Sequence, residues 1–464
     1  MNRRRFLKVA GIGTGVVGIG RDFAAGAPKP SAVGSKPRLP NFLFLLSDDQ
    51  SVPDLGCYGN ETLHTPNIDR LAREGMLFRN GFVTAPSCSP SRSSILTGRS
   101  AHATGTARFR APMPASQKTI LEFLKARGYF TGAFRKVHQG ERFWKRWDFP
   151  GRKKEFATFF DARPKDRPFY LHVGFHDPHR PYFPREFSPS VKPREVAVPG
   201  FLPNTKAVRQ DLAHYYDEIE RMDRNVGRIL ALLEQNGLTE NTLVIFTSDN
   251  GLPFPGAKGT LYDPGLHVPL LARWPGVIEP GRTTPDLISL IDLAPTWLDA
   301  AGIPVPEVME GRSFLPLLQG KDYQPREAVF AERNFHTHLD LMRAVRTSRY
   351  KLIQNYMPEV PYRPLSDLER SPSWRSILEL HEKHKLSPAM ERRFFAKPRP
   401  EVELYDLERD PGETRNLAGD PSEAGTVKAL QERLSQWMVR TSDFLPPPIE
   451  TSEPSSVEEE DPRR

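Results

Sequence analysis

Two pairs of polar side chains, each directly after a short apolar run, could bind a metal ion. Asp48 and Asp49 form the first pair, and Asp249 and Asn250 form the second. Three carboxylates and one amide are an oxygen-only ligand set, which suits a hard divalent cation such as Ca²⁺ or Mg²⁺. Either pair alone is most simply a solvated strand end or a helix cap. Because both pairs follow predicted strands of one sheet, the sequence favours a metal site.

One of the two cysteines, Cys88, lies just before Pro90, Ser91, Arg92 and a short apolar stretch. We expect this segment to enter a helix near Ser91, and a helix N-terminus offers free N–H groups and positive potential to an anion. Arg92 adds a fixed charge suited to tetrahedral oxyanions. A lone cysteine is more often a small buried apolar residue than a nucleophile. The other cysteine, Cys57, is expected to be a buried free thiol.

The elements that must position these side chains alternate between strands and helices over residues 41–325. Apolar runs predict strands at 42–46, 129–134, 169–175, 243–247 and 268–272. Cap residues and helical spacing predict helices at 66–74, 119–126, 207–235 and 289–301. The polar clusters come just after strands. This order is typical of a doubly wound, mostly parallel sheet with its site at the carboxyl ends of the strands.

The pattern changes after about residue 325. Short strands joined by turns are predicted at 328–331, 342–346, 350–354 and 403–405, followed by a helix at 422–439. The fold class is therefore α/β, with a large domain over 41–325 whose mostly parallel sheet is flanked by helices. A smaller α+β domain with an antiparallel sheet follows over 326–445. The Pro-, Glu- and Ser-rich tail over 446–464 is predicted to be disordered.

The first 27 residues have the features of an export signal. A twin arginine, Arg3 and Arg4, precedes a short, weakly apolar, Gly-rich stretch, and a small-x-small cleavage site ends at Ala27. We predict a twin-arginine signal peptide over 1–27 and a linker over 28–40. The twin-arginine export machinery would then deliver a bacterial protein to the periplasm or the medium. The apolar stretch is too short to span a bilayer, so no stable membrane insertion is expected after cleavage.

The charge balance limits the class of partner. The chain has a formal net charge of +8, and its first 27 residues hold five basic residues and one acidic residue, so cleavage would leave a charge of about +4. This modest excess permits an anionic substrate and does not indicate a nucleic-acid partner. Two cysteines give no disulfide framework.

Several stretches together resemble the type I sulfatase family. The pattern C-x-P-S-R-x-x-x-L-T-G is matched over residues 88–98. Similar stretches are SDD near residue 48, FHDPHR at 175–180 and TSDNG at 247–251, and the resemblance extends from about residue 40 to 440. It implies an alkaline-phosphatase-like fold and an enzyme that hydrolyses sulfate groups.

Further stretches are similar to the heparan N-sulfatase branch of that family. They include FLPNTKAVRQDLA at 201–213 and ELYDLERDPGETRNLA at 403–418. This similarity implies that the substrate is a sulfated carbohydrate, namely the N-sulfate of glucosamine in heparan or heparin fragments. The expected process is the degradation of heparan sulfate and related glycosaminoglycans.

The resemblance also implies cofactors and residue roles. Members of the family bind one Ca²⁺ and carry a Cα-formylglycine that a formylglycine-generating enzyme makes from cysteine. By position, the metal ligands would be Asp48, Asp49, Asp249, Asn250 and the modified Cys88. The other functional residues would be Arg92, which holds the formylglycine, Lys136 and His138 beside it, His176 on the sulfate and leaving group, and Lys258 on the sulfate. One departure is Arg135, where the family usually has glycine.

The implied chemistry explains the cysteine. A hydrated formylglycine is a gem-diol, of which one hydroxyl attacks sulfur and the second expels sulfate by re-forming the aldehyde. Ca²⁺, Arg92, Lys136 and Lys258 would stabilise charge on the sulfuryl oxygens. An amine leaving group needs a proton, so His176 is the candidate general acid.

Three alternatives stay open. The enzyme could be an O-sulfatase that acts on another sulfated carbohydrate, or a formylglycine-dependent phosphonate or phosphate monoester hydrolase. A non-catalytic glycan-binding protein would have lost chemical positions, and the sequence shows no such loss. Four further residues could line the substrate pocket: His179, Arg180, His336 and His338.

Overall fold

The computed structural model of the chain describes residues 38–182 and 191–443. The described residues from Leu39 onward belong to one compact unit. The predicted signal peptide (1–27), nearly all of the predicted linker (28–40) and the predicted tail (446–464) lie outside the described residues. Within the two described ranges, no helix combines the length and apolar character that a membrane crossing requires.

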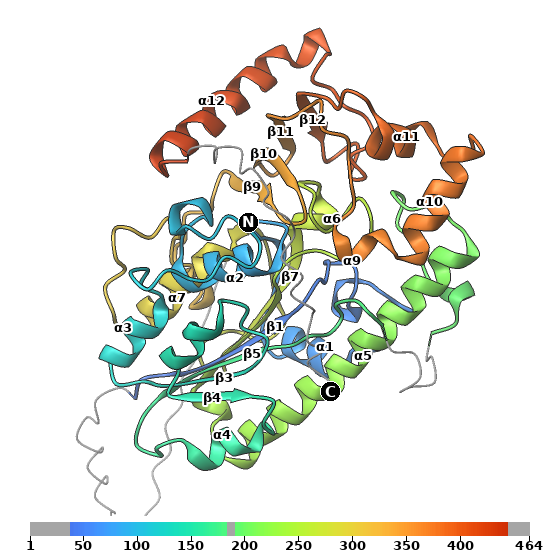
Figure 1. Ribbon diagram of the computed structural model, residues 1–464. Helices are drawn as coiled ribbons and strands as arrows, with labels where there is room; N and C mark the ends of the chain where they lie inside the picture. The colour runs from blue at the N-terminus through green and yellow to red at the C-terminus, as the bar shows by residue number, and fades with distance from the viewer. Residues whose placement is uncertain (1–37, 183–190, 444–464) are drawn as a thin grey trace, which may run out of the picture. The chain divides into compact units, whose positions relative to one another are not determined.

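The large sheet has eight strands, of which β7 runs antiparallel to both of its neighbours and the others pair in parallel (Figure 1). Its spatial order is β4 (Phe149–Arg152), β3 (Phe130–Arg135), β5 (Phe169–Gly174), β1 (Asn41–Ser47), β6 (Thr242–Ser248), β7 (His267–Arg273), β2 (Met76–Phe82) and β8 (Arg282–Ser289). The five strands predicted in this part of the sequence are all present, with ends shifted by at most one residue. The prediction of a mostly parallel sheet is confirmed.

Helices cover both faces of this sheet. They are α1 (Pro66–Arg73), α2 (Cys88–Thr97), α3 (Ile120–Ala126), α4 (Ala157–Ala162), α5 (Lys206–Gln235), α6 (Asp263–Leu266), α7 (Leu293–Ala300) and α8 (Leu315–Leu318). Alternate residues of β1 face opposite sides, as the period of two in a strand requires. Phe42 and Phe44 belong to the core cluster shared with α2, α3 and α7, whereas Leu43 and Leu45 belong to the cluster shared with α1, α4 and α5.

The small sheet is antiparallel, as predicted, with the order β12 (Val402–Asp406), β11 (Tyr350–Asn355), β10 (Leu339–Arg346) and β9 (Val329–Phe335). Helix α12 (Ala424–Arg440) lies beside this sheet (Figure 1) and packs on it through Leu430, Leu434 and Trp437. Three more helices precede β12 in the chain: α9 (Ser366–Glu369), α10 (Pro372–Glu382) and α11 (Pro388–Phe395). Met342 and Ile353 of the small sheet join the core of the large sheet.

Two predictions about local structure were wrong. Helix α2 begins at Cys88 and not near Ser91, because Ser87 is extended with φ −154° and Pro90 is tolerated in the first turn, where its missing N–H is not needed. The helix predicted at 289–301 begins at Leu293, after a short 3₁₀ segment over Leu290–Asp292.

Candidate active site

Four neighbouring parallel strands bring the predicted site residues to one edge of the large sheet. β3, β5, β1 and β6 are adjacent in this order, so their carboxyl ends lie together. The candidate residues follow these strands or precede α6: Lys136 and His138 after β3, His176 after β5, Asp48 and Asp49 after β1, Asp249 and Asn250 after β6, and Lys258 before α6. Cys88 and Arg92 come from α2.

Main-chain hydrogen bonds fix the spacing between the two acidic pairs. β1 and β6 are paired in register along their whole length. Beyond the strands, the Asp49 N–H donates to Asp249 Oδ1 at 3.1 Å, and the Gln50 N–H donates to Asn250 O at 2.9 Å. Asp49 has φ 69°, in the left-handed region that Asp tolerates better than most residues. The backbone therefore sets the distance between the carboxylates.

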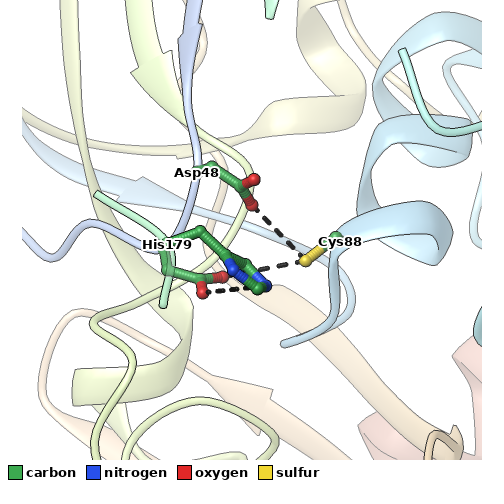
Figure 2. Close-up of side chains that lie close together, drawn as sticks. Asp48, Cys88 and His179 are labelled. Atoms are coloured by element: carbon green, nitrogen blue, oxygen red, sulfur yellow. Dashed lines mark hydrogen bonds and ion pairs between the residues drawn. The ribbon is translucent and has the colours of Figure 1, made fainter. Parts of the chain in front are cut away.

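Cys88 is completely buried beside these acidic residues. Its Sγ lies 3.5 Å from Asp48 Oδ1 (Figure 2) and 3.7 Å from Asp49 Oδ1. Asn250 Nδ2 lies 3.8 Å from the same sulfur. Potential ligand atoms of Asp48, Asp49, Cys88 and His179 all lie within 4.8 Å of one another. The structure thus brings Cys88 together with its predicted neighbours and adds His179 to the group.

Arg92 links this helix to both acidic pairs. Its Nε donates to Asp249 Oδ2 at 2.6 Å, and its Nη1 donates to the main-chain oxygen of Lys136 at 2.5 Å. Its Nη2 lies 3.8 Å from Asp48 Oδ1. The guanidinium is completely buried, so its charge acts where water does not screen it.

Two lysines neutralise part of the acidic charge. Lys136 Nζ forms an ion pair with Asp48 Oδ2. Lys258 is nearly completely buried, and its Nζ lies 2.7 Å from Asp49 Oδ2. Both cations therefore lie beside carboxylates that contact Cys88, and their roles in binding sulfate stay predictions.

Burial and charge shift the pKa values of the three carboxyl groups in different directions. Burial would raise the pKa of Asp48, but Lys136 and other nearby cations hold it well below its usual range. Burial raises the pKa of Asp49 to about 7 despite Lys258, and burial also raises the pKa of Asp249. Burial therefore disfavours the charged forms of Asp49 and Asp249, and a bound divalent cation would favour them.

The donor set fits a hard cation. The side chains of Asp48, Asp49 and Asp249 are 0% exposed. Asn250 Oδ1 is buried and has no hydrogen-bond partner. An unsatisfied buried acceptor costs about 1–3 kcal/mol, and ligation to a metal would satisfy it. These four residues, with an oxygen of the formylglycine expected at Cys88, could therefore hold Ca²⁺.

The end of β3 and the loop after it contain two residues with unusual backbone conformations. Arg135 has φ 60° and His138 has φ 62°. The left-handed region favours glycine, so Arg135 occupies the strained position at which the family resemblance led us to expect glycine. The His138 ring meets the Phe109 ring edge-on at 5.3 Å. Burial, Lys136 and Arg92 hold the pKa of His138 well below its usual range, so this imidazole is neutral.

Sequence reasoning missed Asp367 and named His179 only as a residue that could line the substrate pocket. His179 Nε2 lies 3.7 Å from Asp49 Oδ2 and 3.6 Å from Asp367 Oδ2. Asp367 also accepts a hydrogen bond from Lys258 at 2.5 Å. The FHDPHR stretch contains two histidines, so a second candidate was visible there. His176 lies three residues earlier and is half-buried, and its role stays a prediction.

Three further residues from the sequence analysis have the following surroundings. Arg180 is buried and forms a bidentate pair with Asp211 at 2.7 and 2.8 Å. His336 stacks on Phe109 with ring centroids 3.8 Å apart. Cys57 is a free thiol, as expected, but it is only half-buried.

A cavity beside the N-terminus of α2 is lined by Ser87, Pro90, Asn334 and His336. Three buried polar atoms of this lining have no hydrogen-bond partner: Ser87 Oγ, Asn334 Oδ1 and His336 Nε2. Asn334 belongs to β9, so the small sheet forms part of the wall next to the cysteine helix. The unsatisfied atoms could bind the hydroxyl groups of a polar ligand.

Two models of protein families match most of the described chain. Residues 40–162 and 152–303 match the family model described as Sulfatase. Residues 257–397 match the model described as N-sulphoglucosamine sulphohydrolase, C-terminal.

Individual proteins are similar over most of this chain. N-sulphoglucosamine sulphohydrolase of Homo sapiens is 34% identical over 471 residues, which cover 88% of this chain and 91% of that protein. An ulvan-active sulfatase of Formosa agariphila is 30% identical over 462 residues, which cover 88% of this chain and 76% of that protein. A solved structure described as in complex with its substrate D-glucosamine-2-N,6-O-disulfate has a TM-score of 0.67 at 21% identity. The match covers 88% of this chain and 99% of the chain in the solved structure, so the two chains have the same fold. This chain therefore belongs to the sulfatase family and is a hydrolase of sulfate esters or sulfamates.

Proposed function

We propose that this sulfatase removes the N-linked sulfate from glucosamine in heparan or heparin fragments. The observation that carries the proposal is the match of residues 257–397 to the model named for N-sulphoglucosamine sulphohydrolase. This segment contributes Lys258, Asn334, His336 and Asp367 to the site and its cavity. The relative that is 34% identical has the same name.

The residues of the chain would bind the sulfate group through charge. Arg92, Lys136 and Lys258 are cationic, and burial excludes water from the surroundings of Arg92 and Lys258. A bound Ca²⁺, held by the acidic residues and Asn250, would add positive charge for the sulfuryl oxygens. A formylglycine made from Cys88 would provide the attacking hydroxyl. Preorganised cations of this kind stabilise charge that develops in a transition state.

We propose His179 beside His176 as a candidate proton donor to the leaving amine. Burial lowers the pKa of His179 to about 3, although Asp48 and Asp367 act in the opposite direction. The imidazole is therefore neutral in the free enzyme, and His179 could donate a proton only if an arriving anionic sulfamate raised its pKa. The contacts of His179 with Asp49 and Asp367 place it in the cluster around Cys88.

A leaving-group experiment separates the two histidines. His179→Gln and His176→Gln would be assayed on an N-sulfated glucosamine and on an activated aryl sulfate whose phenolate leaves without a proton. Loss of the general acid should reduce kcat on the sulfamate by about 100-fold or more and change kcat on the aryl sulfate much less. If both variants lose the two activities equally, neither histidine has this role.

The substrate proposal is tested by sulfate release from glucosamine that carries one sulfate, either N-linked or 6-O-linked, with Ca²⁺ present. Peptide mass would first verify the aldehyde at Cys88. Release from the N-sulfated sugar alone supports the proposal. Release only from O-sulfated sugars would favour the O-sulfatase alternative. Ulvan fragments belong among these sugars because the 30% identical relative is an ulvan-active sulfatase. Hydrolysis of phosphonate monoesters alone would favour the remaining enzymatic alternative.

We also propose that Cys88 is modified before its segment folds, and that the folded enzyme is then exported. Cys88 is completely buried at the start of α2, so a modifying enzyme cannot reach it in the native state. Protein made without the formylglycine-generating enzyme and folded should therefore resist conversion when that enzyme is added later. Conversion at native conditions without unfolding would contradict this order.

A further inference from the structure

A second cavity lies between the segment before α6, the small sheet and α11. Its walls include Tyr262, Arg333, Arg393, Arg399, Glu403 and Glu413. Cys88 is not among its lining residues, but Arg333 lines both this cavity and the one beside α2, and Thr260 of its wall is two residues beyond Lys258. The cavity measures about 70 Å³, and one water needs about 10–15 Å³ on this scale. It therefore has room for several waters or one small anion.

The arginines of this cavity are unequally neutralised. Arg333 Nη2 and Arg399 Nη2 pair with one carboxylate, Asp340, at 2.9 and 2.6 Å. Arg393 has no carboxylate partner among the described residues, and its Nη2 donates to the main-chain oxygen of Gly412 at 3.2 Å. Arg392, at the exposed rim, likewise donates to a main-chain oxygen.

The glutamates in the wall are already engaged. Glu413 pairs with the buried Lys351 at 2.7 Å. Glu403 accepts hydrogen bonds from the hydroxyl groups of Tyr262, at 2.8 Å, and Tyr405. The charge of Arg393 is therefore not matched by either of them at ion-pair distance.

Two buried N–H groups of this cavity have no acceptor. They are Nη1 of Arg393 and Nε of Arg399, and the Arg399 side chain is only 9% exposed. The Arg393 guanidinium lies 4.0 Å from the centre of the Tyr262 ring and 5.5 Å from that of Phe201, so aromatic faces fix its position. Buried donors without an acceptor are rare in folded proteins, and an acceptor from outside the chain would satisfy both.

We propose that this cavity, the Arg393 pocket, binds an oxyanion, either a sulfate or a carboxylate group. Guanidinium N–H groups match the geometry of such anions better than a lysine does. Exposed residues at the rim, Pro400, Thr414 and Asn416, leave a path from solvent. The anion has two sources, namely free inorganic sulfate or an acidic group elsewhere on the glycan that is being hydrolysed. Only the glycan source rests on the proposed function.

Calorimetric titration with sodium sulfate at constant ionic strength tests the pocket on the intact enzyme. The wild type is compared with Arg393→Met, with Lys258→Met to remove sulfate binding at the Cys88 site, and with Arg375→Met as the control. Arg375 is an exposed arginine of α10. Thermal unfolding and Arg393→Lys, which keeps the charge, separate loss of the site from loss of the fold.

Sulfate binding that persists in Lys258→Met and Arg375→Met, but weakens about 10- to 100-fold in Arg393→Met, supports the pocket. Equal binding by Arg393→Met and wild type overturns it, and the cavity then holds water only. This titration needs no turnover, so its outcome is independent of the proposed substrate.

Kinetics identify the source of the anion. If the glycan supplies it, Arg393→Met raises KM about 10-fold or more for an N-sulfated oligosaccharide and leaves kcat/KM for the monosaccharide within twofold. If free sulfate is the ligand, added sulfate changes the rate of the wild type on both substrates by more than competition with substrate at the Cys88 site explains. This additional change disappears in Arg393→Met. If neither change occurs, the pocket has no role in binding either anion during turnover and the proposal fails.

Discussion

Arg92 and Asp249 form a completely buried ion pair, with Nε of the arginine 2.6 Å from Oδ2 of the aspartate. The pair joins the helix that begins at Cys88 to the loop after β6. Burial removes both charged groups from water at a large cost in desolvation free energy, which their mutual attraction offsets. Removal of one partner therefore leaves an uncompensated charge in a site without water.

The first prediction concerns this pair. Arg92→Met should lower the free energy of unfolding by about 3–5 kcal/mol and abolish turnover, because Asp249 then lacks its cation. Urea unfolding followed by circular dichroism would measure the change. The double variant Arg92→Met, Asp249→Asn should recover part of the lost stability without recovering activity. Unchanged stability of Arg92→Met would show that another group compensates Asp249.

The second prediction concerns metal removal. A chelator should lower both activity and Tm, because Asp48, Asp49 and Asp249 are buried carboxylates and Asn250 Oδ1 lacks a partner. Added Ca²⁺ at about 100 times its Kd should restore about 2.7 kcal/mol of stability. Asn250→Leu, of similar volume, should respond to Ca²⁺ much less than the wild type. A Tm that changes neither with chelator nor with added Ca²⁺ would contradict a calcium site here.

The third prediction concerns Asp367, whose Oδ2 accepts a hydrogen bond from Lys258 at 2.5 Å. Asp367→Asn keeps the shape and removes the charge that holds Lys258 and faces His179. We expect kcat/KM to fall about 10-fold or more with a change in Tm of only a few degrees, measured by steady-state kinetics and thermal unfolding. Glu369→Gln, an exposed change in the same short helix, should leave both values unchanged. Full activity of Asp367→Asn would remove this residue from the site.

The fourth prediction is a pH dependence of stability away from the active site. His102 Nδ1 lies 3.1 Å from Glu332 Oε1. Burial opposes protonation of His102, but Glu332 raises its pKa above the usual 6.5. Burial would raise the pKa of Glu332, but His102 and its neighbours lower it from 4.5 to about 2. Asp443 favours the charged imidazole and Arg343 opposes it.

The sign follows from proton linkage. The stabilisation from the raised pKa of His102 is full below pH 6.5 and is lost as pH rises through the pKa of the folded state. That from Glu332 is full above pH 4.5 and is lost as pH falls towards 2. The wild type should therefore lose about 1–3 kcal/mol more stability than His102→Gln between pH 6 and pH 9. Parallel pH profiles of the two proteins, from urea unfolding, would contradict the assignment.

The sequence predicted the strands that carry metal ligands because they are continuous apolar runs. β1 and β6 are buried at every position, which is the pattern of central parallel strands. The edge strands β4 and β8 were not predicted, and each contains a proline, Pro150 and Pro285. Proline argues against a central strand but is tolerated at an edge, where one side of the ladder is unpaired. These two segments form strands because they pair with β3 and β2 in the folded chain. A local sequence pattern holds no information about that pairing.

The same limit applies to the site. Asp48, Asp249 and Cys88 could be predicted because each lies next to a recognisable strand end or motif. Asp367 reaches Lys258 across 109 residues of sequence, from a segment with no pattern that indicates chemistry. Only the folded chain shows that this carboxylate belongs to the site. His179 needed the structure for a related reason, because spacing alone does not say which of two histidines in one loop faces the cysteine.

The in-register pairing of β1 with β6 has a consequence for engineering this enzyme. The ligand spacing depends on main-chain hydrogen bonds of two central strands, whereas Asn334, His336 and Asp367 come from later segments. A one-residue insertion in either strand would turn its ligands away from the site, whereas loops can vary around a rigid scaffold. Chimeras that exchange only residues 334–367 between relatives, a segment that contains Asn334, His336 and Asp367 but neither Cys88 nor Lys258, should therefore retain the predicted metal ligands and inherit the donor's choice of sugar.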